Sequence, residues 1–390
     1  MYLSLAFILG ATLAPATGGP EVADFVSCIV CGSRGWSDAI VNVILFMPFG
    51  AALATLGRTG PRPILAGCVL SCAIELAQTV IPGRDPSLGD VTFNTLGTAA
   101  GQAFVWLAHR WVFPDVRTAA RLSLIAALAG LAVVVATARL LEPSLPDGVL
   151  RASYTPDLPE LEWYDGRVLR ATLGSDALRP ERQTDTASLH RLLVEGAPLR
   201  IVAVAGRGVR ALAPLFVVLD EDRHDVLLVG PDRDDLVFRF RPQASRWRLD
   251  QPDLRLRHAF ASLQPGDTLQ IAVRRVGRGY CLAVNRATRC DAGYSAGSGW
   301  ALLYYPRHFP AWAYTLLGAG WLAGLAFPIG LWARRRPETA LALALLGLAL
   351  FVPFTGLIRT PVHQVAGAGL GLVLGRLLQA WRRAVSARTV

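Results

Sequence analysis

The chain lacks lysine altogether and has only three asparagines, Asn42, Asn94 and Asn285, among its 390 residues. Charged residues are also scarce, at 17%, whereas hydrophobic residues reach 53%. So little charge combined with so much apolar surface is typical of membrane proteins and excludes an ordinary soluble globular protein. Because asparagine is so rare here, an asparagine inside an apolar run stands out from its surroundings.

The few charges are placed unevenly along the chain. Residues 142–310 hold 21 of the 29 acidic residues and 23 of the 39 arginines, which leaves 8 acidic residues and 16 arginines for the remainder. A charged segment with a net charge of only +2 thus lies between two apolar blocks. Most of the overall charge of +10 lies in short loops between apolar runs, so the charge gives no indication of nucleic-acid binding.

Eight apolar stretches are long enough to cross a bilayer, at roughly 20 residues a helix. They cover residues 2–16, 39–56, 63–81, 91–108, 122–138, 311–333, 340–358 and 362–380. The first stretch ends in Ala-Pro-Ala-Thr-Gly-Gly, so a cleaved signal peptide is its alternative, although no basic residue precedes it. The predicted fold is therefore a multi-span α-helical membrane protein of about eight transmembrane helices.

Arginine placement orients these stretches, because basic residues collect in cytoplasmic loops. One set of loops is rich in arginine: Arg58, Arg62, Arg110, Arg117, Arg121, Arg334, Arg335, Arg336, Arg382, Arg383 and Arg388. The opposite set has fewer arginines and more acidic residues. Eight alternating spans then place both termini in the cytoplasm and residues 142–310 outside it. Three parts follow: a membrane domain of five helices at 1–141, an extracytoplasmic domain at 142–310, and three further helices with a basic tail at 311–390.

Residues 198–305 show short alternating strands separated by Pro, Gly and Asp turns, at the spacing of a β-sandwich. Strands are expected at 199–204, 215–219, 225–229, 236–241 and 268–273. The preceding residues, 142–197, are more mixed and are expected to wrap the first strands. The rhythm resembles the concanavalin or laminin-G type of sandwich, which often binds carbohydrate. A structural cap without any ligand is the alternative.

Four cysteines lie in segments predicted to face an oxidising compartment. Cys281 and Cys290 flank a predicted hairpin turn near Asn285, so they are expected to form a disulfide. Cys28 and Cys31 are separated by two residues, as C-x-x-C, in an outer loop. No thioredoxin-like βαβ pattern surrounds them, so we interpret them as a local disulfide or two free thiols.

Two acidic runs, 220–225 and 232–235, offer oxygen atoms of the kind that calcium prefers. Neither run has a fixed ligand spacing, and the histidines show no metal spacing among themselves. The sequence therefore predicts no metal site and no cofactor.

Polar residues interrupt the second to fourth apolar stretches and the loop before the fourth, all close to the predicted outer surface. They are Asn42, Glu75, Gln78, Arg84, Asp90 and Asn94. Glu75 and Gln78 are three residues apart and share one helical face. Glu75 is six residues from the outer end of its stretch, which corresponds to roughly 9 Å. An ionisable residue at such depth is costly and indicates a functional site, here a ligand-binding one.

The segments Asn42…Pro48-Phe-Gly50, Glu75-Leu-Ala-Gln78 and Arg84…Asp90…Asn94…Gly97…Gly101 closely resemble the VanZ-like family in order and spacing, over about residues 1–140. The resemblance implies a multi-span membrane protein of the bacterial cell envelope. The founding member is associated with low-level resistance to the glycopeptide teicoplanin. The family implies a location and a site more than a reaction.

The resulting hypothesis is a VanZ-like protein of the bacterial inner membrane with a polar pocket in the outer leaflet. The pocket would hold an amphiphile such as a lipid-linked glycan, the sandwich would bind or shield its sugar part, and a link to glycopeptide-type resistance is a further implication. Arg84 suits a phosphate or carboxylate, because its planar fork gives paired hydrogen bonds. No nucleophile motif, metal cluster or phosphate loop indicates an enzyme. A transporter and a glycan-binding sensor anchored by the helices remain alternatives.

Structural roles for the same residues also remain open. Asp38 and Asp90 would suit the positive ends of two helices as caps. Gly97-x3-Gly101 is typical of close helix packing, with Pro48 and Gly50 in a similar structural role. Glu75 and Asn94 would form a hydrogen-bonded lock between helices as the alternative to ligand contact.

A faint internal repeat is also visible. The eighth stretch contains Gln364-x2-Gly367-x3-Gly371, which matches Asn94-x2-Gly97-x3-Gly101 in spacing. The last two stretches are therefore expected to resemble the third and fourth, with coincidence as the alternative in a chain so rich in glycine and alanine.

Overall fold

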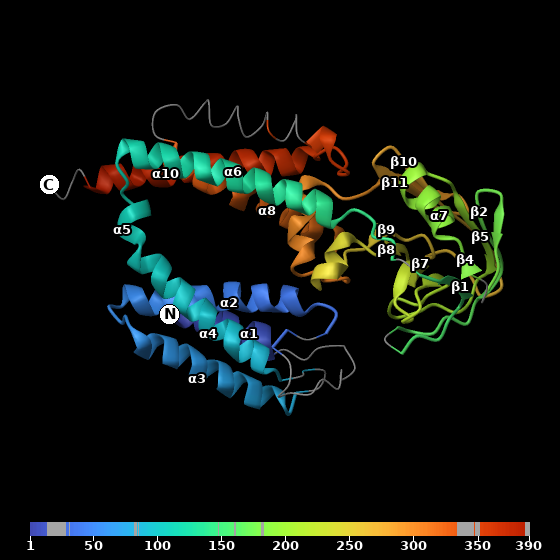
Figure 1. Ribbon diagram of the computed structural model, residues 1–390, viewed down its shortest axis with the longest axis horizontal. Coiled ribbons are helices and arrows are strands. Elements are labelled where there is room, and N and C mark those ends of the chain that lie inside the picture. The colour runs from blue at the N-terminus through green and yellow to red at the C-terminus, as the bar shows by residue number, and fades with distance from the viewer. Residues whose placement is uncertain are drawn as a thin grey trace.

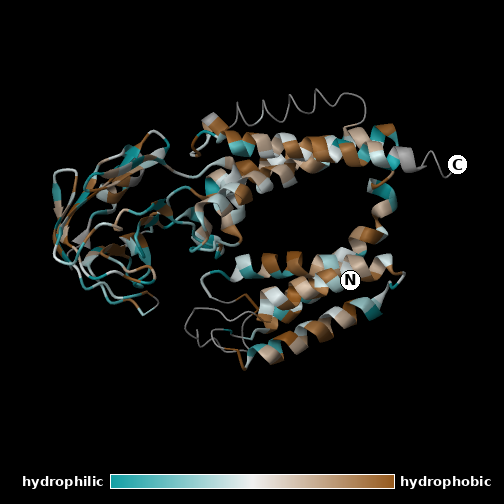
Figure 2. Ribbon diagram, turned by 180° about the vertical axis from the view of Figure 1, so that it is seen from behind, coloured by the Kyte–Doolittle hydropathy of each residue, from teal (hydrophilic) through white to brown (hydrophobic). Residues whose placement is uncertain are grey.

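The computed structural model describes residues 1–13, 29, 30, 32–81, 84, 86–146, 148–159, 161–180, 183–333, 347 and 352–386. It consists of two groups of helices and a β domain that contacts both groups (Figure 1). The strands come from the charged segment of the sequence, and the long helices are largely apolar (Figure 2).

The helices are divided between the two groups at a short connecting helix. The first group contains α1 (Tyr2–Leu13), α2 (Gly35–Thr55), α3 (Pro61–Gln78) and α4 (Leu88–Trp106). After α5 (Ala108–Trp111), the second group contains α6 (Val116–Leu140), α8 (Ala311–Trp332) and α10 (Val362–Ser386). Although α6 precedes the β domain in sequence, its Val134 is buried in one apolar core with Leu322 of α8 and Leu372 of α10.

Three helices are long and apolar enough to cross a membrane: α2, α6 and α8. Helix α1 is apolar but shorter. Helices α3, α4 and α10 reach 18, 19 and 25 residues, but their polar residues leave them less apolar. The expected number of about eight spans is therefore not supported by the part of the chain that the structure describes. Most of the predicted seventh stretch, 340–358, lies outside the described residues.

Each helix group has one end that faces the β domain. Helices α8 and α10 begin at that end and α6 ends there, because these ends connect to or contact the β domain. Helix α2 also begins there, since Ser37 in its first turn bonds to the β domain. At the opposite end, the indole of Trp332 in α8 donates to the carbonyl of Trp111 in α5 at 2.9 Å.

Glycines set the contact between α2 and α4. A Cβ added at Gly97 of α4 would overlap the carbonyl oxygen of Val43 in α2, and one added at Gly101 would overlap that of Met47. A step of four residues along α4, from Gly97 to Gly101, corresponds to a step of four residues in the same direction along α2, from Val43 to Met47. Helices α2 and α4 therefore run parallel. Their backbones touch without intervening side chains, as helix interfaces lined by small residues do.

The contact between α8 and α10 has the same construction. A Cβ added at Gly371 would overlap the carbonyl oxygen of Ala323, and one added at Gly375 would overlap that of Phe327. Gly375 also approaches the amide nitrogen of Leu331. These helices therefore run parallel as well.

The two helix pairs correspond residue for residue. Met47-Pro48-Phe49-Gly50 in α2 matches Phe327-Pro328-Ile329-Gly330 in α8, with a proline inside each helix. Gly50 approaches the backbone of Thr98 as Gly330 approaches that of Leu372. This register pairs Asp90 of α4 with Gln364 of α10. The sequence spacing predicted that Gln364 corresponds to Asn94, which lies four residues after Asp90. That alignment was therefore wrong by one helical turn.

The β domain is a sandwich of two six-stranded antiparallel sheets. The first sheet has the order β4 (Gln183–Thr184), β1 (Leu150–Tyr154), β6 (Phe216–Leu219), β7 (Asp225–Asp232), β8 (Asp235–Phe240), β9 (Leu254–Leu256). The second has the order β12 (Ala287–Ala292), β11 (Gly279–Val284), β10 (Thr268–Val276), β5 (Leu199–Val204), β2 (Arg167–Leu173), β3 (Asp176–Leu178). Short helices α7 (Thr186–His190), η1 (Arg191–Glu195) and η2 (Gln243–Trp247) lie between strands in the chain. A further short helix, η3 (Ala296–Leu302), follows the last strand, and η4 (Val352–Phe354) precedes α10.

A single apolar core fills the space between the sheets. Phe216 and Phe238 of the first sheet are fully buried there with Leu269 of the second. The first sheet is also covered on its other face, where Val237 packs with Leu158. This second covering explains why β8 is buried at every position instead of alternating.

The five expected strands all form, but the expectation for residues 142–197 was wrong. This region contributes β1 and β2, which lie inside the two sheets and do not merely wrap them. Strand β1 pairs with β6, and β2 pairs with β5.

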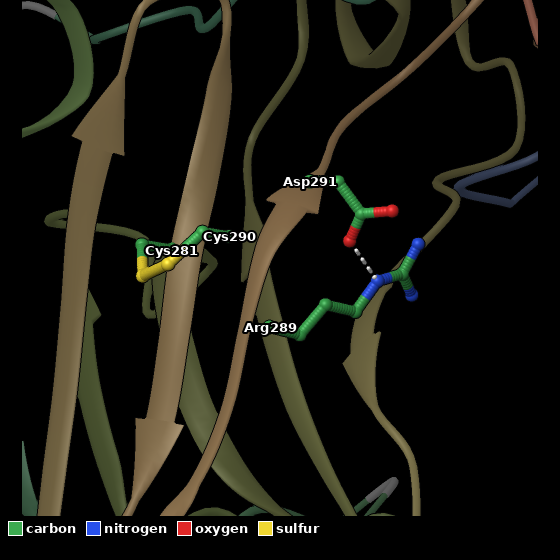
Figure 3. Close-up of a disulfide and its surroundings, with 4 residues drawn as sticks. All are labelled: Cys281, Arg289, Cys290 and Asp291. Carbon is green, nitrogen blue, oxygen red and sulfur yellow. Dashed lines mark hydrogen bonds and ion pairs between the residues drawn. A yellow bond between two sulfur atoms is a disulfide. The ribbon is translucent and has the colours of Figure 1, made fainter.

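The predicted disulfide between Cys281 and Cys290 is present (Figure 3). It joins β11 to β12, and the hairpin turns at Asn285, whose φ of 51° is the left-handed conformation that asparagine tolerates. On the same hairpin, Arg289 and Asp291 form an ion pair at 2.8 Å. Cys28 and Cys31 lie outside the described residues.

Hydrogen bonds fix the base of the β domain to both helix groups. Ser37 of α2 donates from Oγ to the carbonyl of Leu302 at 2.9 Å and accepts from the amide of Asp250 at 2.7 Å. Gln364 of α10 accepts from the hydroxyl of Ser295 at 2.9 Å. Ser37 and Gln364 are only 1% and 6% exposed, so these bonds are shielded from water.

Candidate functional site

The polar residues singled out in the sequence gather at the end of α2, α3 and α4 that faces the β domain. Glu75, Gln78 and Asn94 are buried, with exposed fractions of 4%, 5% and 1%. Asn42 and Asp90 are half-buried, as is Arg84 in the loop between α3 and α4. The cluster thus has a buried inner part and an accessible rim.

Asn42 and Asp90 join α2 to α4 at the rim. The amide Nδ2 of Asn42 donates to Oδ1 of Asp90 at 2.8 Å. Asp90 lies in the first turn of α4 and does not cap it, because the cap is Ser87, whose hydroxyl accepts from the amide of Gly89 at 3.0 Å. Asp38 likewise lies inside the first turn of α2, after the cap position. These two aspartates therefore do not occupy the cap positions, although both lie in the first turn, at the positive ends of their helices, as expected.

Glu75 connects α3 to the start of α4. Its Oε2 accepts from the backbone amide of Ser87 at 2.8 Å. Asn94 instead donates from Nδ2 to the hydroxyl of Ser71 at 2.8 Å. Two separate bonds between α3 and α4 thus take the place of the expected direct lock between Glu75 and Asn94. The carbonyl oxygen Oδ1 of Asn94 is buried and receives no hydrogen bond from the described residues.

Gln78 and Arg84 hold the end of α1. Nε2 of Gln78 donates to the carbonyl of Thr12, and Nη2 of Arg84 donates to the carbonyl of Ala11, both at 2.9 Å. Carbonyls at the end of a helix have no partner within the helix, so donors at this position satisfy them. Arg84 also interacts electrostatically with Glu75.

The site is rich in hydrogen-bond acceptors. The carboxylates of Asp38 and Asp90 are close enough to interact electrostatically, and Arg84 is a cation in the same cluster. Ionised carboxylates only accept hydrogen bonds, so a ligand at the rim would have to bring donors.

A second group with metal-ligand chemistry lies in the β domain, where Asp234, Asp235 and His258 place ligand atoms within 4.8 Å of one another. The sequence did not reveal it because His258 is remote from the acidic run. Asp235 is bonded by Arg257 at 2.8 Å, and Nδ1 of His258 lies 2.6 Å from Asp234. The hydrogen bond to Asp234 raises the pKa of His258, which favours the protonated ring that cannot bind a metal. The arrangement is that of an ion-pair cluster.

Asp253 is the centre of a buried ion-pair network that the sequence did not reveal. Its carboxylate is fully buried and accepts from Nε of Arg239 at 2.7 Å and from Nη2 of Arg255 at 3.0 Å. Arg307, in the segment before α8, lies 3.8 Å away. Burial raises the pKa of Asp253, but the three arginines outweigh it and hold the pKa at about 2. The network therefore ties β8 and β9 to the segment that enters α8.

The comparisons with known proteins identify the segment that carries the first cluster. Residues 11–109 match the model of the VanZ/LLP1 family. The match includes all six polar residues of the cluster and ends before the β domain. Comparison with curated proteins and with solved structures gave no match, so the likeness of the sandwich to concanavalin or laminin-G domains stays an expectation. The apolar helices and the family match together support a membrane protein that has a VanZ-like segment at residues 11–109 and an additional β domain.

Proposed function

We propose that this protein binds an amphiphile at the outer surface of the bacterial inner membrane, with the polar head of the amphiphile in the cluster at the ends of α2, α3 and α4. A lipid-linked glycan fits this description. The observation that carries the proposal is the half-buried rim formed by Asn42, Asp90 and Arg84 over a buried inner part that is hydrogen-bonded to neighbouring segments. A polar site of this kind on apolar helices suits a ligand with one apolar and one polar end.

The helix directions support the proposed orientation. Arg58 lies in the connection between α2 and α3, Arg62 in the first turn of α3 and Arg117 in the first turn of α6, all near helix ends that point away from the β domain. With the positive-inside rule, this arrangement supports a position of the β domain, the polar cluster and the disulfide outside the cytoplasm. We retain the division of the chain at 1–141, 142–310 and 311–390 on the same grounds, with both termini cytoplasmic.

Within the cluster, different residues have different roles. Glu75 and Gln78 are positioning residues, because each is buried and bonded to backbone of a neighbouring segment. Arg84 and Asp90 lie at the rim and would contact the head group. The β domain is fixed above the same end through Ser37, so it would shield or bind the part of the ligand that projects from the membrane. A contribution to glycopeptide resistance would follow if that ligand were a cell-wall precursor.

The test is purification of the full chain in mild detergent, followed by mass spectrometry of the lipids that remain bound. We expect one specific glycolipid or polyprenyl-linked lipid with the unaltered protein and its loss in Arg84→Ala. Arg58→Ala is the matched control, because Arg58 is exposed at the opposite end of the helices. Bulk phospholipid alone, unchanged by Arg84→Ala, would refute the proposal.

Glu75 distinguishes a ligand site from a packing feature. Glu75→Gln keeps an oxygen that can accept from Ser87, so folding and abundance should be preserved. If the specific lipid is then lost, the carboxylate itself matters to the ligand. If Glu75→Gln and Glu75→Ala lower the abundance of the protein equally, the cluster has a structural role only.

The matching helix pairs favour one second candidate, a transporter built from two similar units. A transport pathway must be reachable by water from both sides of the membrane. Single cysteines placed along α4, in a background from which Cys68 and Cys72 have been removed, would be labelled from both sides in a transporter. Labelling only near the β domain would exclude this candidate.

A further inference from the structure

The structure contains an internal comparison for the rim of the proposed site. Gln364 of α10 corresponds to Asp90 of α4, because α10 begins at Val362 and α4 at Leu88, and because the glycine contacts of the two helix pairs superimpose in that register. Whatever Gln364 binds therefore shows which kind of group fits at this position of the pair.

Gln364 binds a segment of the chain's own β domain. Its Oε1 accepts a hydrogen bond from the hydroxyl of Ser295 at 2.9 Å and another from the backbone amide of Gly297 at 3.0 Å. The side chain is 6% exposed, and a Cβ added at Gly297 or Gly318 would be too close to its amide group. One hydroxyl and one amide N–H thus converge on a single acceptor oxygen, in close packing.

Asp90 offers an acceptor oxygen at the position of Oε1 of Gln364, and its carboxylate has a second oxygen that can also accept. Its Oδ1 accepts from Asn42, and no described residue forms a hydrogen bond with its Oδ2. One turn further along α4, the buried Oδ1 of Asn94 likewise has no donor among the described residues. In the register that pairs Gly50 of α2 with Gly330 of α8, Gly318 of α8 corresponds to Asp38 of α2. Asp38 is exposed and lies near Asp90. Oδ2 of Asp90 and Oδ1 of Asn94 are therefore acceptors that no residue in the described part of the chain satisfies, and Asp90 is half-buried rather than covered.

We propose that Asp90 recognises a neutral ligand group in which a hydroxyl and an amide N–H converge on its carboxylate, as Ser295 and Gly297 converge on Gln364. An N-acylated amino sugar has this chemistry, and so does a short peptide with a hydroxyl side chain. The inference rests on the proposed function and specifies the head group of its ligand. The inference also gives the pair of α8 and α10 a role. In that pair, the position that corresponds to Asp90 is Gln364, which binds the β domain and so docks it on the helices.

The test measures saturation-transfer NMR from the full chain in detergent to three probes. N-acetylglucosamine and the peptide acetyl-Ser-Ala-Gly-amide carry both groups, and glucose carries hydroxyls alone. We expect transfer to at least one acylated probe and none to glucose, and the preferred acylated probe identifies the source of the chemistry. Asp90→Asn should weaken binding about tenfold or more, because Asn42 already donates to Oδ1 and the substitution replaces the remaining acceptor Oδ2 with an NH2 group that cannot accept the ligand's donors. Asp90→Glu, which keeps the charge, should weaken it less.

Asp222→Asn is the matched control, because Asp222 is exposed in the β domain and remote from α4. Gel filtration of each variant establishes that it remains folded. The inference is overturned by equal binding of glucose and N-acetylglucosamine, by transfer to neither acylated probe, or by equal affinity in the Asp90→Asn variant. If the lipid test succeeds and this one fails, the amphiphile site stands and only its head-group chemistry is wrong.

Discussion

Asp253 gives the sharpest prediction on stability, because it is the shared partner of two buried arginines. Asp253→Asn keeps the size of the side chain but removes the charge, which leaves Arg239 and Arg255 less compensated in the interior. Breaking a buried ion pair in this way costs about 3–5 kcal/mol. For a domain of this size, such a loss corresponds to a fall in Tm of about 10 °C.

The same carboxylate gives the β domain a pH dependence. The pKa of Asp253 is held at about 2 in the folded state, below the ordinary value of 3.8 expected in the unfolded chain. A lowered folded-state pKa contributes stability that is present above about pH 4 and is lost as the pH falls through about 2. The shift corresponds to about 2 kcal/mol, lost over that window.

The assay is thermal unfolding of the full chain in detergent, followed by near-ultraviolet circular dichroism across that pH window. Asp253→Asn should lower Tm at neutral pH and should lose stability less steeply than the unaltered protein on acidification. Asp222→Asn, at an exposed position, is the control and should change Tm little. If the two variants behave alike, or if Asp253→Asn retains the full acid dependence, the reasoning about the network is wrong.

Two further predictions concern packing and covalent structure. Gly101→Ala and Gly375→Ala should each lower Tm, because the added Cβ meets backbone of the neighbouring helix. Gly369→Ala should leave the stability unchanged or raise it by up to about 1 kcal/mol, because its Cβ meets open space. Thermal melts of the three variants test this, and equal effects would contradict the helix contacts. Removing the disulfide with Cys281→Ser and Cys290→Ser should lower the free energy of unfolding by about 2–4 kcal/mol. Reduction should change the gel mobility of the unaltered protein but not that of the double variant. If reduction leaves the mobility of the unaltered protein unchanged, the bond does not form.

The strands that the sequence predicted are those with a simple period. Residues 199–204 alternate between buried and less buried positions, so the pattern was visible. Strand β2 was missed because a bulge interrupts its alternation, where the consecutive residues Leu169 and Arg170 are both exposed. Strand β8 is buried on both faces, yet its apolar residues were frequent enough to reveal it.

The polar cluster could be predicted because its members are rare residues inside apolar helices, where each one is conspicuous. Their pairing could not be predicted, since it depends on how α2, α3 and α4 are rotated. Glu75, for example, bonds to the backbone of Ser87, which no side-chain pattern reveals. The network around Asp253 was hidden for a related reason, because its arginines come from three separate segments and resemble ordinary surface charges in sequence.

The packing of α6 against α8 has a consequence for how the chain is made. The ribosome completes α6 and then the whole β domain before it reaches α8 and α10, so α6 enters the membrane long before its partners exist. Its buried small residues, including Ala126 and Ala138, must wait for them. The β domain, in turn, cannot reach its final position until Gln364 has been synthesised near the end of the chain. Assembly of this half of the protein is therefore necessarily a late event in biosynthesis, whereas α1 to α4 can associate as soon as they emerge.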